Sequence, residues 1–388
     1  MESTLQRTRA DISLDHLAYN LQVIRKQVGD TPRLLAVVKA DAYGHGAVRV
    51  ARHLAKNGAS FFAVSNCDEA EELRTHGIDL PILILGYTPP DQISRLLRLN
   101  IVQCVPDRQV ALAYRDALQN TDQKLCIHLK LDTGMGRLGF QCDDLHFAES
   151  LRDILDVLSM DCFDAEGIFT HFAVSDEANE EDDAYTLLQH ERFLRMIKEA
   201  EDASGHRFKI KHCANSGAIA RFPQFAHDMV RCGIILYGAG DLAADLSMKP
   251  VMTFRTTVAE VKQYAANESI SYGRTYVTDK ETRIAVLPVG YADGLFRTLS
   301  GKLTVHTPCG TASQIGRICM DMCMIDATAL PDLKPGDDAE IFGEHRPVGD
   351  LAKQCGTIPY ELLCAVSKRV PRYYYSDGAC VDYNLQLL

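Results

Sequence analysis

One lysine stands where an apolar strand is expected to end, and its amine could do covalent chemistry. Lys39 follows the apolar run 33–38 and leads into a loop that ends in Gly44-His45-Gly46. Burial disfavours the charged ammonium and frees the nitrogen lone pair, so a lysine in this position is a candidate Schiff-base amine. The plainer alternative is a surface lysine at a strand end.

Two loops of small residues could bind a phosphate group. The first begins with Asn215-Ser216, and the second contains Arg231, Gly233 and Ile234. Short side chains leave backbone N–H groups accessible, and such groups bind anions well. A reactive amine combined with a phosphate cup is the pairing that pyridoxal 5′-phosphate (PLP) requires.

Two further ionisable residues lie within or at the end of apolar runs. Lys130 lies inside the run 124–131, where a buried cation needs a partner or a chemical modification. His171 ends the run 166–172, and a lone histidine of this kind is more often a hydrogen-bonded core residue than a catalyst.

Two motifs suggest other cofactors, and we expect neither to be bound. The segment from Gly134 to Gly139 fits the G-x-G-x-x-G dinucleotide fingerprint, but four βα units precede it, whereas the fingerprint belongs on the first. Cys319 and Cys323 are the nearest approach to a metal pair and have no other obvious ligands nearby. We therefore expect no nicotinamide site and no metal site.

The elements that must position these residues alternate regularly along the first part of the chain. Apolar runs alternate with amphipathic segments that have apolar residues every three or four positions, which predicts a (β/α)8 barrel over residues 1–242. The predicted barrel strands are 33–39, 60–65, 81–87, 101–105, 124–131, 166–172, 208–213 and 228–231. Residues 10–14 predict an extra strand that packs with the second domain, followed by a helix capped by Asp15.

Beyond residue 242 the helical periodicity fades, which predicts a mainly-β domain over residues 243–388 with one short helix at 360–366. Its predicted strands are 251–261, 270–277, 283–289, 302–306, 311–318, 323–325 and 338–342. Tyr272, Tyr291, Tyr360 and the pair Met320-Asp321 lie beside turns of this domain. A tyrosine at a turn usually serves packing, but together these loops resemble the rim of a site.

Composition excludes several classes of protein. The chain has 388 residues, of which 46% are hydrophobic, and a formal net charge of −11. A net anion argues against nucleic-acid and membrane-surface partners, and no apolar run approaches the roughly 20 residues that span a bilayer. The start of the chain lacks the apolar core of a secretory signal. The 13 cysteines form no C-x-x-C pair, which indicates reduced, buried thiols in a cytoplasmic protein.

The segment from Val37 to Gly46 closely resembles the cofactor-lysine motif of the alanine racemases, PLP enzymes with a barrel and a β domain. The likeness covers nearly the whole chain in order. The other matching segments are Lys130-Leu-Asp-Thr-Gly-Met-Gly-Arg137, Thr170-His171-Phe-Ala, Asn215-Ser216, Arg231-Cys-Gly233-Ile234, Ser271-Tyr272-Gly, Gly290-Tyr291-Ala-Asp-Gly, Met320-Asp321 and Tyr360-Glu-Leu-Leu.

The resemblance implies a role for each matching residue. Lys39 and Tyr272 would be the two bases, on opposite faces of the substrate–cofactor adduct, and Tyr272 would come from the partner in a head-to-tail homodimer. Lys130 would match the lysine that is carbamylated in many members. The implied cofactor-binding residues are Lys39, Tyr43, Arg137, His171, Asn215, Ser216, Arg231, Gly233, Ile234 and Tyr360. The implied substrate-binding residues are Arg137, Met320, Tyr291 and Asp321.

The main interpretation is therefore a cytoplasmic enzyme that interconverts L- and D-alanine for cell-wall peptidoglycan precursors or for D-alanine catabolism. A serine or broader-specificity racemase is the nearest alternative. A PLP amino-acid decarboxylase and a non-catalytic PLP-binding protein are more distant alternatives. One departure from the family is the lack of a tryptophan near Arg9-Ala10, which questions how the first strand packs.

Overall fold

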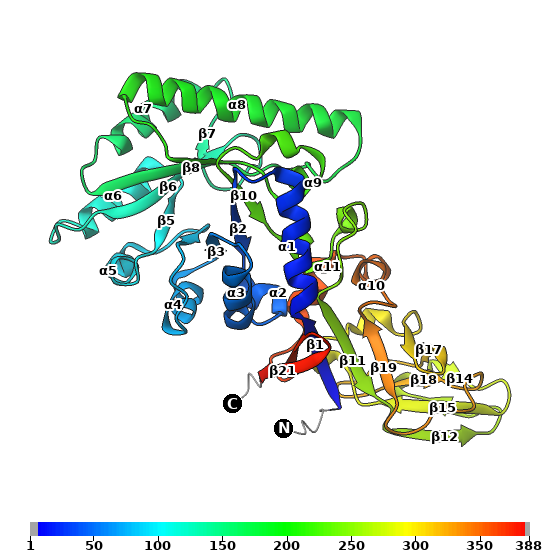
Figure 1. Ribbon diagram of the computed structural model, residues 1–388. Helices are drawn as coiled ribbons and strands as arrows, with labels where there is room; N and C mark the ends of the chain where they lie inside the picture. The colour runs from blue at the N-terminus through cyan, green and yellow to red at the C-terminus, as the bar shows by residue number, and fades with distance from the viewer. Residues whose placement is uncertain (1–6, 385–388) are drawn as a thin grey trace. The chain divides into compact units, whose positions relative to one another are not determined.

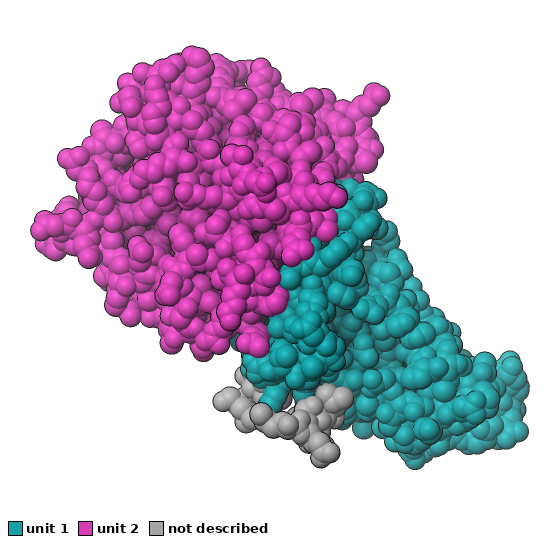
Figure 2. All heavy atoms as spheres, viewed as in Figure 1, with its two compact units in different colours: residues 1–20, 43–46, 237–388 teal, residues 21–42, 47–236 magenta. Residues whose placement is uncertain are grey.

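The computed structural model describes residues 7–384, which fall into two compact units (Figures 1 and 2). The barrel unit comprises Leu21–Ala42 and Ala47–Leu236, magenta in Figure 2. Among the described residues, the β unit comprises 7–20, Tyr43–Gly46 and 237–384, teal in the same view. The four residues Tyr43–Gly46, which begin four positions after Lys39, thus belong to the β unit.

The barrel unit contains parallel strands in the order β10-β2-β3-β4-β5-β6-β8-β9. Two backbone hydrogen bonds join the ends of this row, from Arg231 N to Ala214 O (2.9 Å) and from Asp228 N to Lys211 O (3.2 Å). The predicted barrel is therefore confirmed. Its strands are β2 (Arg33–Val37), β3 (Phe61–Val64), β4 (Ile82–Ile84), β5 (Val102–Val105), β6 (Leu125–Asp132), β8 (Phe163–Phe169), β9 (Ile210–His212) and β10 (Met229–Cys232).

Three helices of this unit begin at a residue whose side chain caps them. Asn66, Asp107 and Asn179 each accept a hydrogen bond from an amide of the first helical turn, as good N-cap residues do. The long helix α8 runs beside α7 in Figure 1. The helices are α1 (Leu14–Val28), α2 (Lys39–Gly44), α3 (Ala47–Lys56), α4 (Cys67–Thr75), α5 (Ile93–Arg98), α6 (Arg108–Ala117), α7 (Phe147–Leu158), α8 (Glu180–Ser204) and α9 (Ser216–Arg221), with the short η1 (Pro90–Gln92), η2 (Pro223–Phe225) and η3 (Ile234–Tyr237).

The β unit is built on a ten-stranded sheet in the order β12-β15-β18-β17-β16-β19-β11-β1-β20-β21. The predicted extra strand is confirmed as β1 (Thr8–Ser13), antiparallel to β11 and parallel to β20. Its Ala10 and Ile12 are fully buried, so the strand packs without a tryptophan. The other strands of the sheet are β11 (Met252–Thr257), β12 (Glu260–Tyr264), β15 (Thr282–Leu287), β16 (Thr304–Thr307), β17 (Gly310–Ile315), β18 (Cys323–Asp326), β19 (Asp338–Phe342), β20 (Arg372–Ser376) and β21 (Ala379–Asn384).

Several details differ from the sequence predictions. The predicted strand 251–261 is two strands, and 270–277 is a separate small ladder of β13 (Ser269–Ile270) and β14 (Tyr276–Val277) around η5 (Tyr272–Arg274). The short helix is confirmed as α11 (Pro359–Ala365). The sequence patterns did not predict β7 (Phe140–Gln141), α10 (Val348–Cys355), β20 or β21.

The capping role predicted for Asp15 is wrong. Ser13 precedes α1, and its Oγ accepts the hydrogen bond from the amide of His16 (3.1 Å). The carboxylate of Asp15 instead accepts hydrogen bonds from Ser376 Oγ (3.0 Å) and from the amide of Asp377 (2.8 Å). A residue inside the first turn can reach outward to a neighbouring strand, whereas the residue before the helix is the one whose oxygen faces the free amides.

All 13 cysteines are free, but the expectation that they are buried holds for six of them only, since the other seven are partly or fully exposed. Across residues 7–384 the longest apolar stretches within helices are too short or too charged to cross a bilayer. Residues 1–6, on which much of the expectation about a secretory signal depends, lie outside the described residues.

Candidate active site

Lys39 begins α2, and the chain that follows it is a left-handed turn. The φ angles of Ala40, Asp41, Ala42 and Tyr43 are all between 52° and 55°, and the amide of Ala42 bonds to the carbonyl of Val38 (2.9 Å). Left-handed helical backbone costs an L-residue about 1–2 kcal/mol, so four such residues in succession are held there by their surroundings. Strain of this kind concentrates at functional sites.

Two carboxylates of the barrel unit hold this turn. Glu69 accepts hydrogen bonds from the amide of Ala40 (2.8 Å) and from the amide of Ser65 after β3 (2.7 Å). Asp41 accepts one from the amide of Ala47 at the start of α3 (2.8 Å). The backbone that carries Lys39 is therefore anchored on both sides.

Arg231 lies at the end of β10, is 3% exposed, and directs its guanidinium at carbonyl oxygens and imidazole nitrogens. Its Nη2 donates to the carbonyls of Thr170 (2.7 Å) and Cys213 (3.0 Å) and to Nδ1 of His171 (3.2 Å). Its Nη1 donates to Nδ1 and to the carbonyl of His212 (3.1 and 3.2 Å). Burial lowers the pKa of Arg231 to about 10, so the group remains cationic near neutrality.

The bonds from Arg231 determine the tautomers of the histidines around it. A guanidinium only donates, so Nδ1 of His171 and Nδ1 of His212 are acceptors, and in the neutral rings Nε2 carries the proton. His212 Nε2 then donates to Nδ1 of His128 (3.0 Å), whose own Nε2 lies 3.6 Å from Glu166 Oε2. Burial, followed by the charge of Arg231, holds the pKa values of His171 and His212 well below the usual range.

Lys130 lies in β6, is 5% exposed, and its Nζ is 4.7 Å from the centre of the Phe169 ring. Burial lowers its pKa to about 8, with Arg231 and Arg137 acting in the same direction. In the described part of the chain no carboxylate forms an ion pair with this amine. The predicted need for a partner or a modification therefore stands.

The glycine-rich loop after β6 binds a carboxylate of its own chain. Asp132 accepts hydrogen bonds from the amides of Gly134, Met135, Gly136 and Arg137, at 2.9–3.1 Å. The amides that a dinucleotide phosphate would need are therefore already used. The same bonds fix the loop that presents the exposed side chain of Arg137.

The loop between β9 and α9 is positioned by Asn215. Its Oδ1 caps α9 by accepting from the amide of Ala218 (3.0 Å) and also accepts from Ser175 Oγ (2.7 Å). Ser216 and Gly217 form the first turn of α9, whose leading amides have no partner within the helix. A Cβ at Gly217 would lie 2.7 Å from the amide nitrogen of Asp176, so only glycine fits. Gly233 and Ile234 occupy the corresponding junction between β10 and η3.

In the β unit, Tyr43 and Tyr360 lie together as predicted. Their ring centres are 5.9 Å apart, and Tyr237 packs on the other side of Tyr43 at 4.9 Å. Burial raises the pKa of Tyr43 well above its usual value, so its hydroxyl stays protonated and is available as a hydrogen-bond donor. The two tyrosines come from opposite ends of the chain, on α2 and α11.

A second group in the β unit surrounds an open pocket of about 450 Å³. Tyr272, Met320 and Asp321 all line it, together with Ser271, Cys319, Met322 and Met324. The structure thus brings together three of the predicted site residues. Tyr272 is 70% exposed, and its turn is fixed by Ser271, whose φ is 66° and whose Oγ donates to the carbonyl of Arg317 (2.7 Å).

The loops that carry Tyr291 and Met320 are joined through their backbones. The amides of Tyr291 and Ala292 donate to the carbonyls of Cys319 and Met320, both at 3.0 Å. Gly290 allows this approach, because a Cβ there would lie 2.3 Å from both carbonyl oxygens. Arg369 orients Asp321 by donating a hydrogen bond to its carboxylate (2.8 Å). Arg369 also donates to the carboxylate of the buried Asp293 (2.7 Å).

Three residues around these sites were not assigned a role from the sequence. They are Glu69, His128 and His212. His212 could have been noticed, because it lies in a predicted strand three positions before the predicted loop that begins at Asn215. The other two act through partners 29 and 84 positions away in sequence, a distance that no local pattern reveals.

Comparison with known proteins decides the family. The family model described as "Alanine racemase, N-terminal domain" matches residues 12–241, and "Alanine racemase, C-terminal domain" matches residues 251–374. The chain belongs to the alanine racemase family. It is 41% identical to alanine racemase 2 of Caldanaerobacter subterraneus subsp. tengcongensis and 42% identical to the alanine racemase of Clostridium perfringens strain SM101, with 98% of each chain covered in both cases.

Solved structures of the alanine racemase family agree with the fold. The alanine racemase of Clostridium difficile 630 has a TM-score of 0.93 and 38% identity, with both chains fully covered. The alanine racemase of Bacillus anthracis, solved with bound L-Ala-P, has a TM-score of 0.89 and 31% identity, covering 99% of this chain and 98% of the other. The resemblance drawn from the lysine motif is confirmed.

Proposed function

We propose that this chain racemises alanine by a two-base mechanism in which Lys39 and Tyr272 exchange a proton with opposite faces of the substrate. The chain is a PLP-dependent isomerase of the alanine racemase family. The observation that carries the mechanism is the contact from Arg231 to His171, because it leaves one imidazole N–H free to serve a phenol.

The residues present fit PLP. The loop at Gly217 leaves no room for a side chain, and the first amides of α9 beside it suit a phosphate. We assign phosphate binding to Ser216, Gly233, Ile234, Tyr43 and Tyr360, with Asn215 as a positioning residue. Arg231 would contact the pyridine nitrogen, and Lys39 would hold the aldehyde carbon. When bound, the cofactor supplies an electron sink for the negative charge that develops at the substrate Cα.

Racemisation requires proton transfer on two faces. A single fixed base would have to cross a planar group between removing and returning the proton, whereas two bases need only small movements. Lys39 would hold the cofactor when substrate is absent, and its amine would serve one face of the bound substrate. Tyr272 serves the other. A phenol has an ordinary pKa of about 10, so it needs a donor to stabilise its ionised form, and Nε2 of His171 supplies one.

We propose that Tyr272 acts in the barrel of a partner subunit, within a head-to-tail homodimer. Three large apolar side chains around its pocket are well exposed: Tyr272 at 70%, Met320 at 53% and Met322 at 46%. A cluster of this kind on a protein surface marks an interaction site. Covering it with a second copy of the chain would bury the methionines and bring the phenol out of water.

Lys130 and Arg137 are proposed to act as a pair. A neutral amine attacks the carbon of CO₂ and loses one proton, which forms a carbamate anion at Nζ. The pKa of about 8 leaves a fraction of Lys130 neutral at physiological pH. The anion would orient the guanidinium of Arg137 toward the substrate carboxylate and the phenolic oxygen of the cofactor.

Substrate size is proposed to be limited by Tyr291, Tyr360, Met320 and Asp321. Tyr291 and Met320 come from two loops whose backbones are joined by hydrogen bonds. The distance between these two side chains is therefore restricted. A tight pocket favours a methyl side chain over larger ones, but rejection of an added hydroxyl is modest, about 10- to 200-fold. Slow turnover of serine is therefore expected.

The product D-alanine would serve peptidoglycan precursors, and we propose the cytoplasm as the place of action. Thirteen free cysteines support a reducing compartment.

The proposal is tested by following proton exchange in deuterium oxide. Tyr272→Phe should lose racemisation by about 10²- to 10⁴-fold, the usual contribution of a general acid–base group. It should still exchange the Cα proton of one enantiomer, because Lys39 remains. A Tyr272→Phe enzyme that racemises at the wild-type rate would contradict the mechanism, and equal loss of exchange for both enantiomers would contradict the assignment of separate faces.

A further inference from the structure

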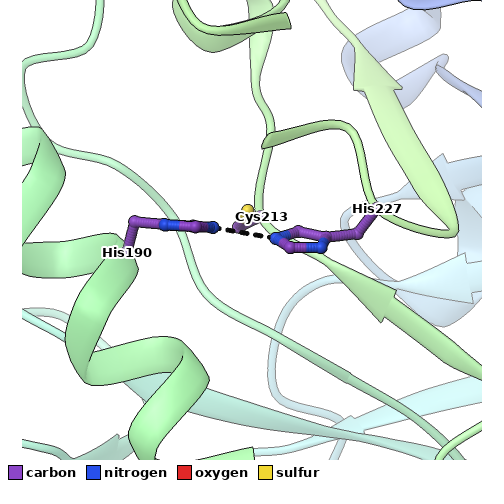
Figure 3. A group of neighbouring side chains, drawn as sticks. All are labelled: His190, Cys213 and His227. Carbon is purple, nitrogen blue, oxygen red and sulfur yellow. Dashed lines mark hydrogen bonds between the residues drawn. The ribbon is translucent and has the colours of Figure 1, made fainter. Parts of the chain in front are cut away.

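Three metal-ligating side chains that have no role in the proposed mechanism meet in the barrel unit. His190 comes from α8, Cys213 follows β9, and His227 precedes β10. Figure 3 shows the two imidazoles pointing toward each other with the thiol beside them. One ligand atom from each residue lies within 4.8 Å of the other two, and the two Nε2 atoms are 2.9 Å apart.

The surroundings hold these side chains in place before any ligand arrives. The ring of His190 stacks on Phe225 at 3.8 Å and on His227 at 5.1 Å. Cys213 is fully buried, and its Sγ is directed by a bond to the carbonyl of Phe225 (3.3 Å). His227 has a φ of 43°, a backbone conformation that is uncommon for histidine and persists only where the structure fixes it.

We propose that His190, Cys213 and His227 bind a thiophilic divalent cation of the Zn²⁺ class, with water as the fourth ligand. Tetrahedral Zn²⁺ with bonds of about 2.0–2.1 Å to nitrogen and about 2.3 Å to sulfur places its ligand atoms about 3.3–3.6 Å apart. The distances between the ligand atoms observed here, from 2.9 Å between the two nitrogens up to 4.8 Å, bracket those values. Small rotations of the side chains would therefore bring all three atoms to bonding distance of one cation. Hard cations such as Mg²⁺ and Ca²⁺ prefer oxygen and do not suit this donor set.

The proton balance of binding is simple. Burial lowers the pKa of His190 to about 4, and the neighbouring His227 acts in the same direction, so the ring is neutral near pH 7. In the pair, one Nε2 donates to the other. When both bind a cation, that proton moves to Nδ1 of the same ring. The thiol of Cys213 gives up its proton to solvent, as metal-bound thiolates do.

No sequence pattern predicts this site, because its members are separated by 23 and 14 positions and belong to none of the short-spaced metal motifs. The expectation of no metal depends on Cys319 and Cys323 alone. Binding at the new position would link α8 to the strand end whose carbonyl, at Cys213, accepts a hydrogen bond from Arg231. An ion there would therefore stabilise the barrel end that carries the loop of Asn215.

The test is a titration of the PLP-loaded enzyme, freed of metal by a chelator, with Co²⁺ and then with Zn²⁺. One Co²⁺ per chain should produce the thiolate charge-transfer absorption and the visible bands of tetrahedral cobalt, and Zn²⁺ should abolish both. His190→Phe keeps the stacking on Phe225, and His227→Asn keeps a residue that tolerates left-handed backbone. Each should weaken binding by more than about 100-fold, since changes outside the ligands already cost about 10- to 100-fold.

Two matched controls identify where the metal binds. Cys67→Ala removes another buried thiol of the same unit, and His76→Ala removes an exposed imidazole. Both should bind one Co²⁺ with wild-type affinity and spectrum. Absence of stoichiometric tetrahedral cobalt in the wild type would overturn the proposal. The proposal would equally fail if His190→Phe and His227→Asn kept the spectrum, because the ion would then lie on other cysteines. Neither result bears on racemisation.

Discussion

Arg231 donates from Nη2 to Nδ1 of His171 across 3.2 Å, and this contact determines which nitrogen of the imidazole carries its proton. The guanidinium cannot accept, so the neutral ring presents Nε2–H on its other side. One buried cation thus does two things in the proposed mechanism. It would meet the pyridine nitrogen of the cofactor, and it prepares His171 as a donor to the phenolate of Tyr272 from a partner subunit.

Replacing Arg231 should therefore change the pH dependence of racemisation as well as its rate. Burial and the charge of Arg231 both lower the pKa of His171, so in Arg231→Gln that pKa should rise. With a higher pKa, the imidazole of His171 becomes protonated at a higher pH. The acidic limb of the pH profile of kcat should therefore move to higher pH. Arg231→Lys keeps the charge and is the control, with a limb close to that of the wild type. The interpretation fails if both variants keep the wild-type limb at saturating PLP.

Lys130 should need carbon dioxide for full activity. Lys130→Ala is expected to lower kcat/KM for alanine by about 10- to 100-fold, because Arg137 loses the anion that orients it. A small carboxylate such as acetate should restore part of the loss. The adduct itself is detected by carbon-13 NMR after exposure to labelled bicarbonate. A wild-type enzyme that shows no carbamate signal and keeps full activity in CO₂-free buffer would exclude this role.

Asn215 should matter for the cofactor beyond its role as a helix cap. Asn215→Ala removes an N-cap, which costs about 1 kcal/mol, and leaves the hydroxyl of Ser175 without its acceptor. We expect lower stability and a higher Kd for PLP, measured by fluorescence of the apoenzyme during titration. Asn179→Ala is the matched control, because Asn179 caps α8 through the amide of Asp182 (3.0 Å). It should lose comparable stability while keeping its Kd for PLP, and an equal rise in Kd for both variants would refute the assignment.

The left-handed turn after Lys39 should store measurable strain. Ala40 is exposed and has a φ of 52°. Ala40→Gly removes the Cβ, which costs about 1–2 kcal/mol in this conformation. The greater conformational freedom of glycine in the unfolded chain offsets about 0.5–1 kcal/mol of that gain. The free energy of unfolding in urea should rise by up to about 1 kcal/mol. Ala40→Val should lower it. The opposite order of the two variants would show that the turn is not strained at this position.

The barrel could be predicted from the sequence because its strands are buried on both faces and so read as short apolar runs. Their carboxyl ends meet at one edge of a barrel, which is why His171, Asn215 and Arg231 could be selected together from the order of the runs alone. The loops of the β unit were harder to interpret. Tyr272 and Met320 share a pocket because the segments around Ser271 and Arg317 bond to each other, a pairing with no local signature.

Other features could not have been read from the sequence for physical reasons. Ala40, Ala42 and Tyr43 have no preference for positive φ, and the hydrogen bonds that Glu69 and Asp41 accept hold the turn in that conformation. Strand β20 pairs with β1 from the opposite end of the chain, and β21 in turn pairs with β20. Contacts of this range are set by the fold as a whole.

The central claim, that Lys39 and Tyr272 of different subunits form one active site, is tested most directly by complementation. Lys39→Ala and Tyr272→Phe each inactivate both sites of their own dimer. In a mixed dimer, one site combines the intact Lys39 of one chain with the intact Tyr272 of the other.

A statistical mixture of the two inactive variants should therefore regain about a quarter of wild-type racemase activity, since about half of the dimers are mixed and each has one working site. Isolated mixed dimers, separated by two different affinity tags, should show about half of the wild-type rate on the same reasoning. If the mixed dimers stay as inactive as their parents, the two residues do not serve a shared site and the account is wrong.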